Sequence, residues 1–309
     1  MILPYPIFKR FARNVFHRYR NRFCFAEKTF HWFAVGALSP KLEFARISRL
    51  AFARRIDVGG DRDIDTGIVV EMPIGLAGLV PLVGRSVDAV SDVFMGRLSD
   101  RLEALTGWRV VAVRGLVPDE VFFDHLANRR FPAGAFLRSE AELDYIEEPD
   151  VFHDIFGHVP LLADPVYAAY LQAYGQAGAR AMARGRLKNL ARLYWYTVEF
   201  GLIEEAGALR LFGAGIMSST AESVFALEDP SPHRVRFDLE RVMRTDYIID
   251  DFQQVYFVID SFEALLAACD SDFGPLYDRL EGAEVIAPNR LLPGDAVLTR
   301  GTLAYFDKG

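Results

Sequence analysis

Residues 149–160 read PDVFHDIFGHVP, and they place two histidines, His153 and His158, five positions apart. On a regular α-helix five residues rotate by about 140°, so the two imidazoles would not face one ligand. We expect them to converge only where the helix ends or distorts. Gly157 supplies that freedom, and Pro160 stops the helix from running on. The flanking side chains are largely apolar, which predicts a buried pair whose commonest strong partner is a metal ion. The plain alternative is two unrelated histidines, one of them at the surface.

A third ligand has to come from another segment, and Glu199 is the best candidate. It lies in the stretch LYWYTVEFGL at 193–202, which we expect to be part of a long helix over 187–205. Taken alone, this carboxylate could reach solvent or pair with an arginine, but on an aromatic face it is costly to bury unless a cation meets it. Two imidazoles and one carboxylate suit a non-haem Fe(II) that binds O2, and they also suit a hydrolytic zinc. The ligand set alone leaves both metals open.

The rest of the chain predicts a mainly α-helical fold with a few short β-strands. Apolar residues at helical spacing, and prolines at the starts of segments, indicate most of the helices. The expected helices are 86–105, a segment from Pro118, 150–159, a segment from Pro165, 187–205, 236–244 and 261–269. Alternating patterns predict short strands at 108–113 and 131–137 and a hairpin at 297–306.

Composition excludes several classes of protein. Hydrophobic residues make up 51% and charged residues 25% of the 309 residues, which is typical of a globular protein rather than a disordered one. A net charge of −7 argues against a general nucleic-acid binder. The two cysteines cannot form a disulfide framework, so a reducing, cytoplasmic location is expected. The longest charge-free apolar stretch, 72–84, is thirteen residues, short of the roughly 20 that a membrane span needs.

Three stretches in this order resemble the tetrahydropterin-dependent aromatic amino acid hydroxylases, and among them most nearly the bacterial phenylalanine 4-hydroxylases. They are 149–162, 193–202 and GAGIMSS at 213–219. The match extends from about residue 87 to near residue 280. It implies a single, mostly helical catalytic domain, which we expect over residues 86–309, with Fe(II) and a tetrahydropterin as cofactors. Phenylalanine and O2 are the implied substrates and tyrosine the product.

The resemblance also assigns roles to single residues around the metal and the pterin. His153, His158 and Glu199 fall on the iron ligands of the family. Pterin contacts are implied for five further residues: the ring of Phe122, the backbone at Gly115 and Leu116, and the side chains of Asp154 and Tyr194. Stacking a flat heterocycle on a phenyl ring is physically sensible.

The substrate pocket is assigned in the same way. The resemblance implies that Arg138 holds the substrate carboxylate, a task that suits a bidentate guanidinium. Pro149 and Trp195 would line the pocket for the substrate ring. Ser218 is placed there too, next to one of the iron-binding histidines. Ile249 stands where family members that act on tyrosine tend to have an acidic residue, which favours phenylalanine as the substrate.

The first 85 residues depart from the family pattern. Residues 1–55 hold twelve Lys or Arg and two acidic residues, a net charge of +10. They are also rich in phenylalanine, and the further helical motif usual in bacterial members is not recognisable among residues 1–85. Three interpretations compete: an organelle transit peptide, a basic arm for an anionic surface, and a mis-called start that never evolved to pack. The last carries the most weight, so residues 1–85 are expected to stand apart from the catalytic domain.

Two other functions stay open at the level of sequence. One is a zinc-dependent hydrolase that uses the same three ligands with Asp154 as the general base. The other is an inactive relic of the hydroxylase fold. Neither an amino-acid-sensing regulatory domain nor a C-terminal tetramerisation helix is recognisable, so we expect a monomer that meets small molecules only.

Overall fold

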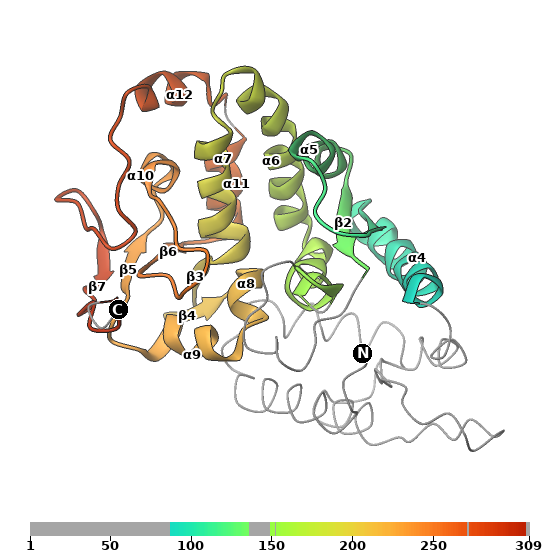
Figure 1. The fold of residues 1–309 in the computed structure, drawn as a ribbon, viewed down its shortest axis with the longest axis horizontal. Helices are drawn as coiled ribbons and strands as arrows, with labels where there is room; N and C mark the ends of the chain where they lie inside the picture. Colours follow the sequence, from blue (N-terminus) through green and yellow to red (C-terminus); the bar gives the residue numbers. More distant parts are fainter. Residues whose placement is uncertain (1–86, 136–148, 152, 271, 307–309) are drawn as a thin grey trace, which may run out of the picture.

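The structure is a computed structural model that describes residues 87–135, 149–151, 153–270 and 272–306. Within these residues, the prediction of a mainly helical domain with a few short strands is confirmed. Helices occupy the centre and one side of the molecule, and a mixed sheet lies on the other side (Figure 1). The expectations for residues 1–85 and for Arg138 fall outside the described residues.

The central helices are α6 (Pro165–Ala183) and α7 (Leu187–Tyr194), which stand side by side in Figure 1. α6 begins where the sequence predicts. Pro165 fits the first turn because its missing N–H would find no partner within the helix anyway. Asp164 caps the same turn, since its carboxylate accepts the backbone N–H groups of Val166 and Tyr167 at 2.9 and 3.0 Å.

The elements before α6 also follow the prediction. α4 (Val87–Thr106) ends at Gly107, whose φ of 77° is the left-handed conformation common just after a helix. β1 (Arg109–Val113), α5 (Asp119–Ala127) and β2 (Arg130–Gly134) follow, and the two strands pair in parallel. Figure 1 shows this group along one flank of α6.

The larger sheet has five strands in the order β4-β3-β6-β5-β7. Their bounds are β3 (Leu202–Glu205), β4 (Ala208–Leu211), β5 (His233–Arg236), β6 (Val255–Ile259) and β7 (Val297–Thr299). β6 is buried along its whole length and pairs in parallel with both β3 and β5. The strands at the two edges, β4 and β7, run antiparallel to their neighbours.

The remaining regular helices lie in the connections between the strands of this sheet. They are α8 (Ala214–Met217), α9 (Thr220–Glu228), α10 (Leu239–Arg244), α11 (Phe262–Cys269) and α12 (Gly274–Leu280). α11 matches the predicted helix over 261–269 and begins after Ser261, whose hydroxyl accepts the backbone N–H of Ala264. In the described part of the chain, no helix combines the length and apolar character that crossing a bilayer requires.

The helix predicted over 187–205 was wrong in its last third. Helical backbone stops at Glu199, and residues 202–205 form strand β3. The chain then reverses at Ala206 and Gly207, whose φ values of 52° and 76° suit a two-residue hairpin turn. β4 follows antiparallel to β3, so the apolar run that looked helical is the buried strand of a hairpin.

Two further boundaries differ from the prediction. Helix 236–244 begins only at Leu239, because Arg236 belongs to strand β5 and the Asp238 carboxylate caps the helix. The hairpin predicted over 297–306 is a single strand, β7, which pairs with β5. The chain after β7 bonds instead to the backbone and hydroxyl of Ser231.

Candidate metal centre

The stretch that carries the two histidines folds as a π-helix, η3 (His153–His158). A π-helix closes its hydrogen bonds between residues five apart, so residues i and i+5 lie one turn above each other. His153 and His158 therefore face the same side, as the metal hypothesis requires. Asp150 starts this turn: its carboxylate accepts the backbone N–H of His153 at 2.9 Å, and its carbonyl accepts the N–H of Asp154 at 3.0 Å. A short 3-10 helix, η4 (Val159–Ala163), follows with Pro160 in its first turn.

The helix distorts between the two histidines as expected, but through a π-helical turn rather than a left-handed bend at Gly157. Gly157 does not adopt the left-handed conformation, and the wide π-helical turn brings the rings together. The glycine is needed for packing instead. A Cβ at this position would lie 2.7 Å from the Cβ and 2.9 Å from the Cα of Ala214. Its missing side chain lets α8 come into contact with η3.

Glu199 lies at the end of a second π-helical turn, η5 (Trp195–Glu199), which continues directly from α7. The backbone N–H of Phe200 donates to the carbonyl of Trp195 at 2.8 Å, a bond between residues five apart. Inside the turn, the Thr197 hydroxyl donates to the Leu193 carbonyl at 2.5 Å and forms a 2.8 Å hydrogen bond with the Tyr170 hydroxyl. The carboxylate of Glu199 thus comes from a turn that is anchored in the core.

Two glycines of the GAGIMSS stretch, Gly213 and Gly215, allow this segment to pack closely against the turn that carries Glu199. A Cβ on Gly213 would lie 2.3 Å from the carbonyl oxygen of Glu199, and one on Gly215 would lie 3.1 Å from the same atom and 2.9 Å from the Phe200 ring. The missing side chains let the start of α8 lie directly against η5. Because Gly157 performs the same task against η3, α8 clamps the two π-helical turns together.

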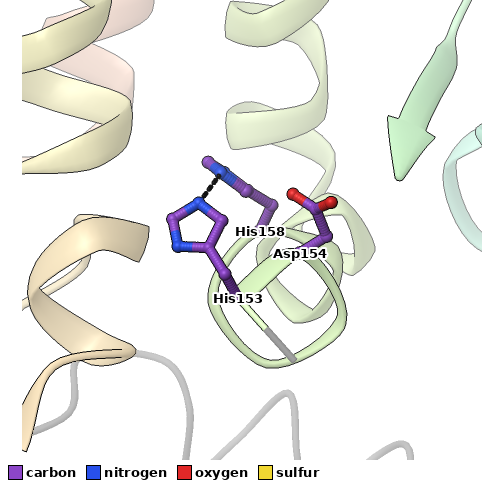
Figure 2. Close-up of side chains that lie close together, drawn as sticks. All are labelled: His153, Asp154 and His158. Atoms are coloured by element: carbon purple, nitrogen blue, oxygen red, sulfur yellow. Dashed lines mark hydrogen bonds between the residues drawn. The ribbon is translucent and has the colours of Figure 1, made fainter. Parts of the chain in front are cut away.

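The three predicted ligands converge. The Nε2 atoms of His153 and His158 are 3.0 Å apart, and their rings meet edge to face (Figure 2). One carboxylate oxygen of Glu199 lies 3.4 Å from the Nε2 of His153, and the other lies 3.2 Å from the Nε2 of His158. Both imidazoles are buried and the Glu199 side chain is 15% exposed. Three donor atoms at one point, with the carboxylate partly open to one side, are the geometry of a two-histidine, one-carboxylate metal site.

The charges of these groups are coupled. Burial alone would lower the pKa of His158, but the charge and hydrogen bond of Glu199, together with Asp154, raise the pKa above its ordinary value. Burial would likewise raise the pKa of Glu199, yet His158 and His153 lower it. The pocket therefore favours a carboxylate with positive charge beside it. A divalent cation would supply that charge and would leave the imidazoles neutral, so the donor set fits a metal ion.

Asp154 also lies near the two histidines, and donor atoms of His153, Asp154 and His158 fall within 4.8 Å of one another. Its carboxylate, however, is occupied at β2, where it accepts the backbone N–H of Gly134 at 2.7 Å; Figure 2 draws it apart from the two rings. Burial raises the pKa of Asp154 to about 7. Glu199, which contacts both imidazoles and has a lowered pKa, is therefore better placed than Asp154 to share a cation with them.

Ser218 supports the first histidine. Its hydroxyl lies 2.9 Å from the Nδ1 of His153, the ring nitrogen that faces away from Glu199. Such an outer hydrogen bond fixes the ring and its tautomer. The Nδ1 of His158 is buried and has no hydrogen-bond partner among the described residues. The structure thus places the Ser218 hydroxyl against the His153 ring.

Aromatic rings surround the ligands. Phe122 meets Tyr194 edge to face at 5.6 Å between ring centroids, and Tyr194 lies 6.3 Å from the His158 ring. On another side, Trp195 is stacked between Phe200 at 4.7 Å and Tyr247 at 4.3 Å. We call these rings the aromatic shell: Phe122 and Tyr194 lie on the side of the His158 ring, and Trp195 stands at the start of the turn that ends in Glu199.

The other predicted residues lie farther from these contacts. Gly115 and Leu116 are in the loop between β1 and α5, and Leu116 is 74% exposed. Pro149 is exposed, and its carbonyl lies against Gly134. Arg138 lies outside the described residues.

Sequence reasoning missed two polar residues that organise the site. Asp150, which is fully buried, starts the first π-helical turn, and its position before the histidine as a typical capping residue could have indicated this. Gln253 accepts the indole N–H of Trp195 at 3.0 Å from 58 residues away. No local pattern marks such a contact, because it depends on how β6 meets η5.

Comparison with known proteins supports this assignment. A family model described as biopterin-dependent aromatic amino acid hydroxylase matches residues 88–270, a range that contains every site residue named above. The chain is 65% identical over 213 residues to the phenylalanine-4-hydroxylase of Caulobacter vibrioides, covering 69% of this chain and 72% of that protein. It is 55% identical over 215 residues to that of Chromobacterium violaceum, covering 70% and 72%.

Solved structures give the same result. The phenylalanine hydroxylase of Chromobacterium violaceum bound to cobalt superposes with a TM-score of 0.65 at 56% identity, covering 66% of this chain and 74% of that one. Its structure with iron and phenylalanine bound gives a TM-score of 0.63 at 55% identity over the same shares.

Proposed function

Because the chain belongs to the biopterin-dependent aromatic amino acid hydroxylases, we propose that it converts phenylalanine to tyrosine with a tetrahydropterin and O2 at a ferrous ion. We further propose that His153, His158 and Glu199 hold that ion. The single observation that carries the ligand assignment is the convergence of two imidazole nitrogens and two carboxylate oxygens within 3.4 Å. Two imidazoles and one carboxylate leave coordination positions open, as O2 chemistry at Fe(II) requires.

Bound Fe(II) and tetrahydropterin supply the activation of O2, and the protein's own residues hold and orient the reactants. Ser218 keeps the His153 ring turned so that its Nε2 faces Glu199. The π-helical turns fix the three donors from opposite sides, while α8 prevents them from separating. Rigid placement of this kind lowers the entropy that the reaction has to lose.

We assign the aromatic shell to the two flat reactants. Phe122 would stack on the pterin ring, with the backbone at Gly115 and Leu116 along its edge and Asp154 and Tyr194 nearby. This assignment is supported by the resemblance and by the contact of Phe122 with Tyr194 beside His158. Aromatic side chains on the side of His158 also limit the access of water to the reacting atoms.

The substrate side of the pocket is assigned to Trp195, Pro149, Ser218 and Arg138. Trp195 would form the wall against the phenyl ring, since stacking on two neighbours holds its own ring still. Arg138 would bind the amino-acid carboxylate through its guanidinium group, an assignment that rests on the motif in the sequence.

The proposed catalytic unit is residues 86–309, with residues 1–85 outside it. The described contacts of the three proposed ligands with one another, with Asp150 and with Ser218 fall between residues 150 and 218, which supports placing them in one unit. We also propose that the protein acts as a monomer in the cytoplasm. The ordinary charge balance and the two cysteines support that location.

The test is anaerobic reconstitution of the protein with Fe(II), followed by addition of phenylalanine, a tetrahydropterin and O2. We expect tyrosine to form only when all four components are present. If folded, iron-loaded protein yields no tyrosine, the proposed activity is wrong. A zinc-dependent hydrolase would need neither pterin nor O2, and an inactive relic would bind iron without turnover, so the same experiment separates these alternatives.

A further inference from the structure

Gln253 is a buried glutamine that joins three parts of the molecule. It lies just before β6, and only 1% of its surface is exposed. Its side-chain oxygen accepts the indole N–H of Trp195 at 3.0 Å and the backbone N–H of Ile248 at 3.3 Å. Its side-chain nitrogen donates to the carbonyls of Ile248 at 2.5 Å and Asp251 at 3.3 Å. Two donors meet the oxygen and two acceptors meet the nitrogen, so the orientation of the amide is fixed by its partners.

The backbone of Gln253 is held as firmly as its side chain. Its N–H donates to the carboxyl oxygen of Glu222 at 3.2 Å, and the same oxygen accepts the hydroxyl of Tyr256 at 2.8 Å. Glu222 belongs to α9 and Tyr256 to β6, and both are buried. The backbone that carries the Gln253 side chain is therefore held in place where strand β6 begins.

The hydrogen bond to Gln253 uses the only polar atom of the Trp195 side chain. The indole has a single N–H donor, which Gln253 occupies. Its two faces are covered by Phe200 and Tyr247. Stacking alone allows a ring to slide within its own plane. A hydrogen bond at the edge of the ring prevents that movement. The hydrogen bond from the indole to Gln253 thus restricts the in-plane movement of the Trp195 ring.

The same amide closes the loop between Tyr247 and Gln253. Both backbone groups of Ile248 bond to it, and Asp251 adds a third contact. This loop presents Ile249, which is 63% exposed, beside the Tyr247 ring that stacks on Trp195. A single side chain therefore sets the relative position of the Trp195 ring and of the loop that carries Ile249.

We propose that Gln253 is a positioning residue for the substrate, which holds Trp195 and the loop at 247–252 in the arrangement that receives the phenyl ring of phenylalanine. This inference rests on the proposed function, because it takes Trp195 as a wall of the substrate pocket. Gln253 touches none of the three proposed metal ligands in the contacts described for it, so its effect is expected on the amino acid rather than on iron.

The test compares Gln253→Met with Gln254→Met in the iron-loaded full chain. Methionine preserves length and bulk but can neither accept from the indole nor donate to the loop. Gln254 is a matched control, because it is equally buried and adjacent, and its side-chain nitrogen donates only to the Phe252 carbonyl at 3.0 Å among the described contacts. We expect Gln253→Met to raise the KM for phenylalanine about tenfold, as for one lost buried hydrogen bond, and to leave the KM for the pterin within about twofold. A purely structural role would lower the yield of active enzyme and move both variants alike.

A spectroscopic measurement checks the contact itself. The chain has three tryptophans, Trp32, Trp108 and Trp195, so an indole ¹H–¹⁵N spectrum has three resonances to assign. We expect Gln253→Met to move the Trp195 resonance and speed its exchange with solvent in the diamagnetic zinc-loaded protein, while Gln254→Met leaves it in place. Trp195→Phe identifies the peak. An unmoved Trp195 resonance in Gln253→Met overturns the proposal whether or not the enzyme is active.

A double-mutant cycle then tests whether Gln253 acts through Trp195. In a Trp195→Phe background, Gln253→Met should raise the KM for phenylalanine clearly less than tenfold, because the indole contact is already missing and only the contacts with the loop remain to be lost. A full effect in that background overturns the proposed route. Absence of tyrosine from the wild type would instead refute the proposed function, and a normal wild type with unchanged KM in Gln253→Met would refute only the positioning role.

Discussion

Two buried glutamates stand in contrasting surroundings. Glu199 ends a π-helical turn and faces His153 and His158, which lower its pKa despite burial. Glu222 lies in α9 at the end of the sheet, where it accepts from a tyrosine hydroxyl and a backbone N–H. Burial raises its pKa to about 7, and those two hydrogen bonds oppose the rise only in part.

The difference shows how to tell a metal-binding carboxylate from a structural one. Burial is common to both groups, so burial alone is no sign of function. What separates them is the partner: Glu199 meets nitrogen atoms that can share a cation, while the described partners of Glu222 are hydrogen-bond donors that a neutral acid can also accept. The variants below test that distinction.

Removal of a ligand is expected to have the largest effect. His153→Ala, His158→Ala and Glu199→Ala should each abolish iron retention, because two remaining donors cannot hold the ion. Metal analysis after gel filtration of reconstituted protein gives the occupancy. Full iron occupancy in any one of these variants would contradict the ligand assignment.

The matched control for this experiment is Glu222→Gln. It changes a glutamate of comparable burial that contacts no histidine among its described partners, and the amide still offers an oxygen to Tyr256 and Gln253. Iron occupancy should equal that of the wild type. Loss of iron from this variant would mean that any change to a buried glutamate disrupts the site, and the contrast between the two residues would fail.

The pH dependence of stability is the next largest effect. The pKa of Glu222 is 4.5 ordinarily and about 7 in the folded protein. Because the folded pKa is raised, the stability contributed by neutral Glu222 is fully present below pH 4.5 and is lost as pH rises through 7. The shift corresponds to roughly 3 kcal/mol of unfolding free energy. Denaturant unfolding between pH 4.5 and 8 should show a flatter profile for Glu222→Gln than for the wild type, and equal slopes would contradict the raised pKa.

Close packing of the two π-helical turns gives the third effect. Gly157→Ala would place a Cβ 2.7 Å from the Cβ of Ala214, so α8 has to move away from η3. We expect a loss of about 2 kcal/mol in unfolding free energy, together with weaker iron binding. Gly96→Ala is the control, because a Cβ there meets nothing within 4 Å and alanine is the better helix former. If Gly157→Ala loses no more stability than Gly96→Ala, the steric explanation is wrong.

The regular helices could be predicted from sequence because their signals are local. The start of helix α6 is indicated by Asp164 and Pro165. The end of α4 is indicated by Gly107, which adopts the left-handed conformation. The convergence of His153 and His158 could also be predicted, because two buried imidazoles need a polar partner and a shared metal ion requires both rings to face it. Each of these inferences uses residues only a few positions apart.

The misses involve information that is not local. A π-helical turn differs from an α-helical one by a single shifted hydrogen bond, and the two have no separate residue pattern in His153–His158. Strand β3 looked helical because its reversal uses Ala206 in a left-handed conformation, where a glycine or asparagine is the usual signal. Gln253 was missed because its partner, Trp195, is 58 residues away.

The smallest expected effect distinguishes a ligand from its support. Ser218→Ala removes the hydrogen bond to the Nδ1 of His153 but leaves all three donors, so iron binding should weaken roughly tenfold without being lost. Ser219→Ala is the matched control: that hydroxyl caps α9 by accepting the N–H of Glu222, and its loss should cost about 1 kcal/mol of stability with iron affinity unchanged. Competition with a chelator and denaturant unfolding measure the two quantities on the same samples. If both variants lose stability and neither loses iron affinity, Ser218 is a structural residue like its neighbour, and the support of the His153 ring has to come from elsewhere in the turn.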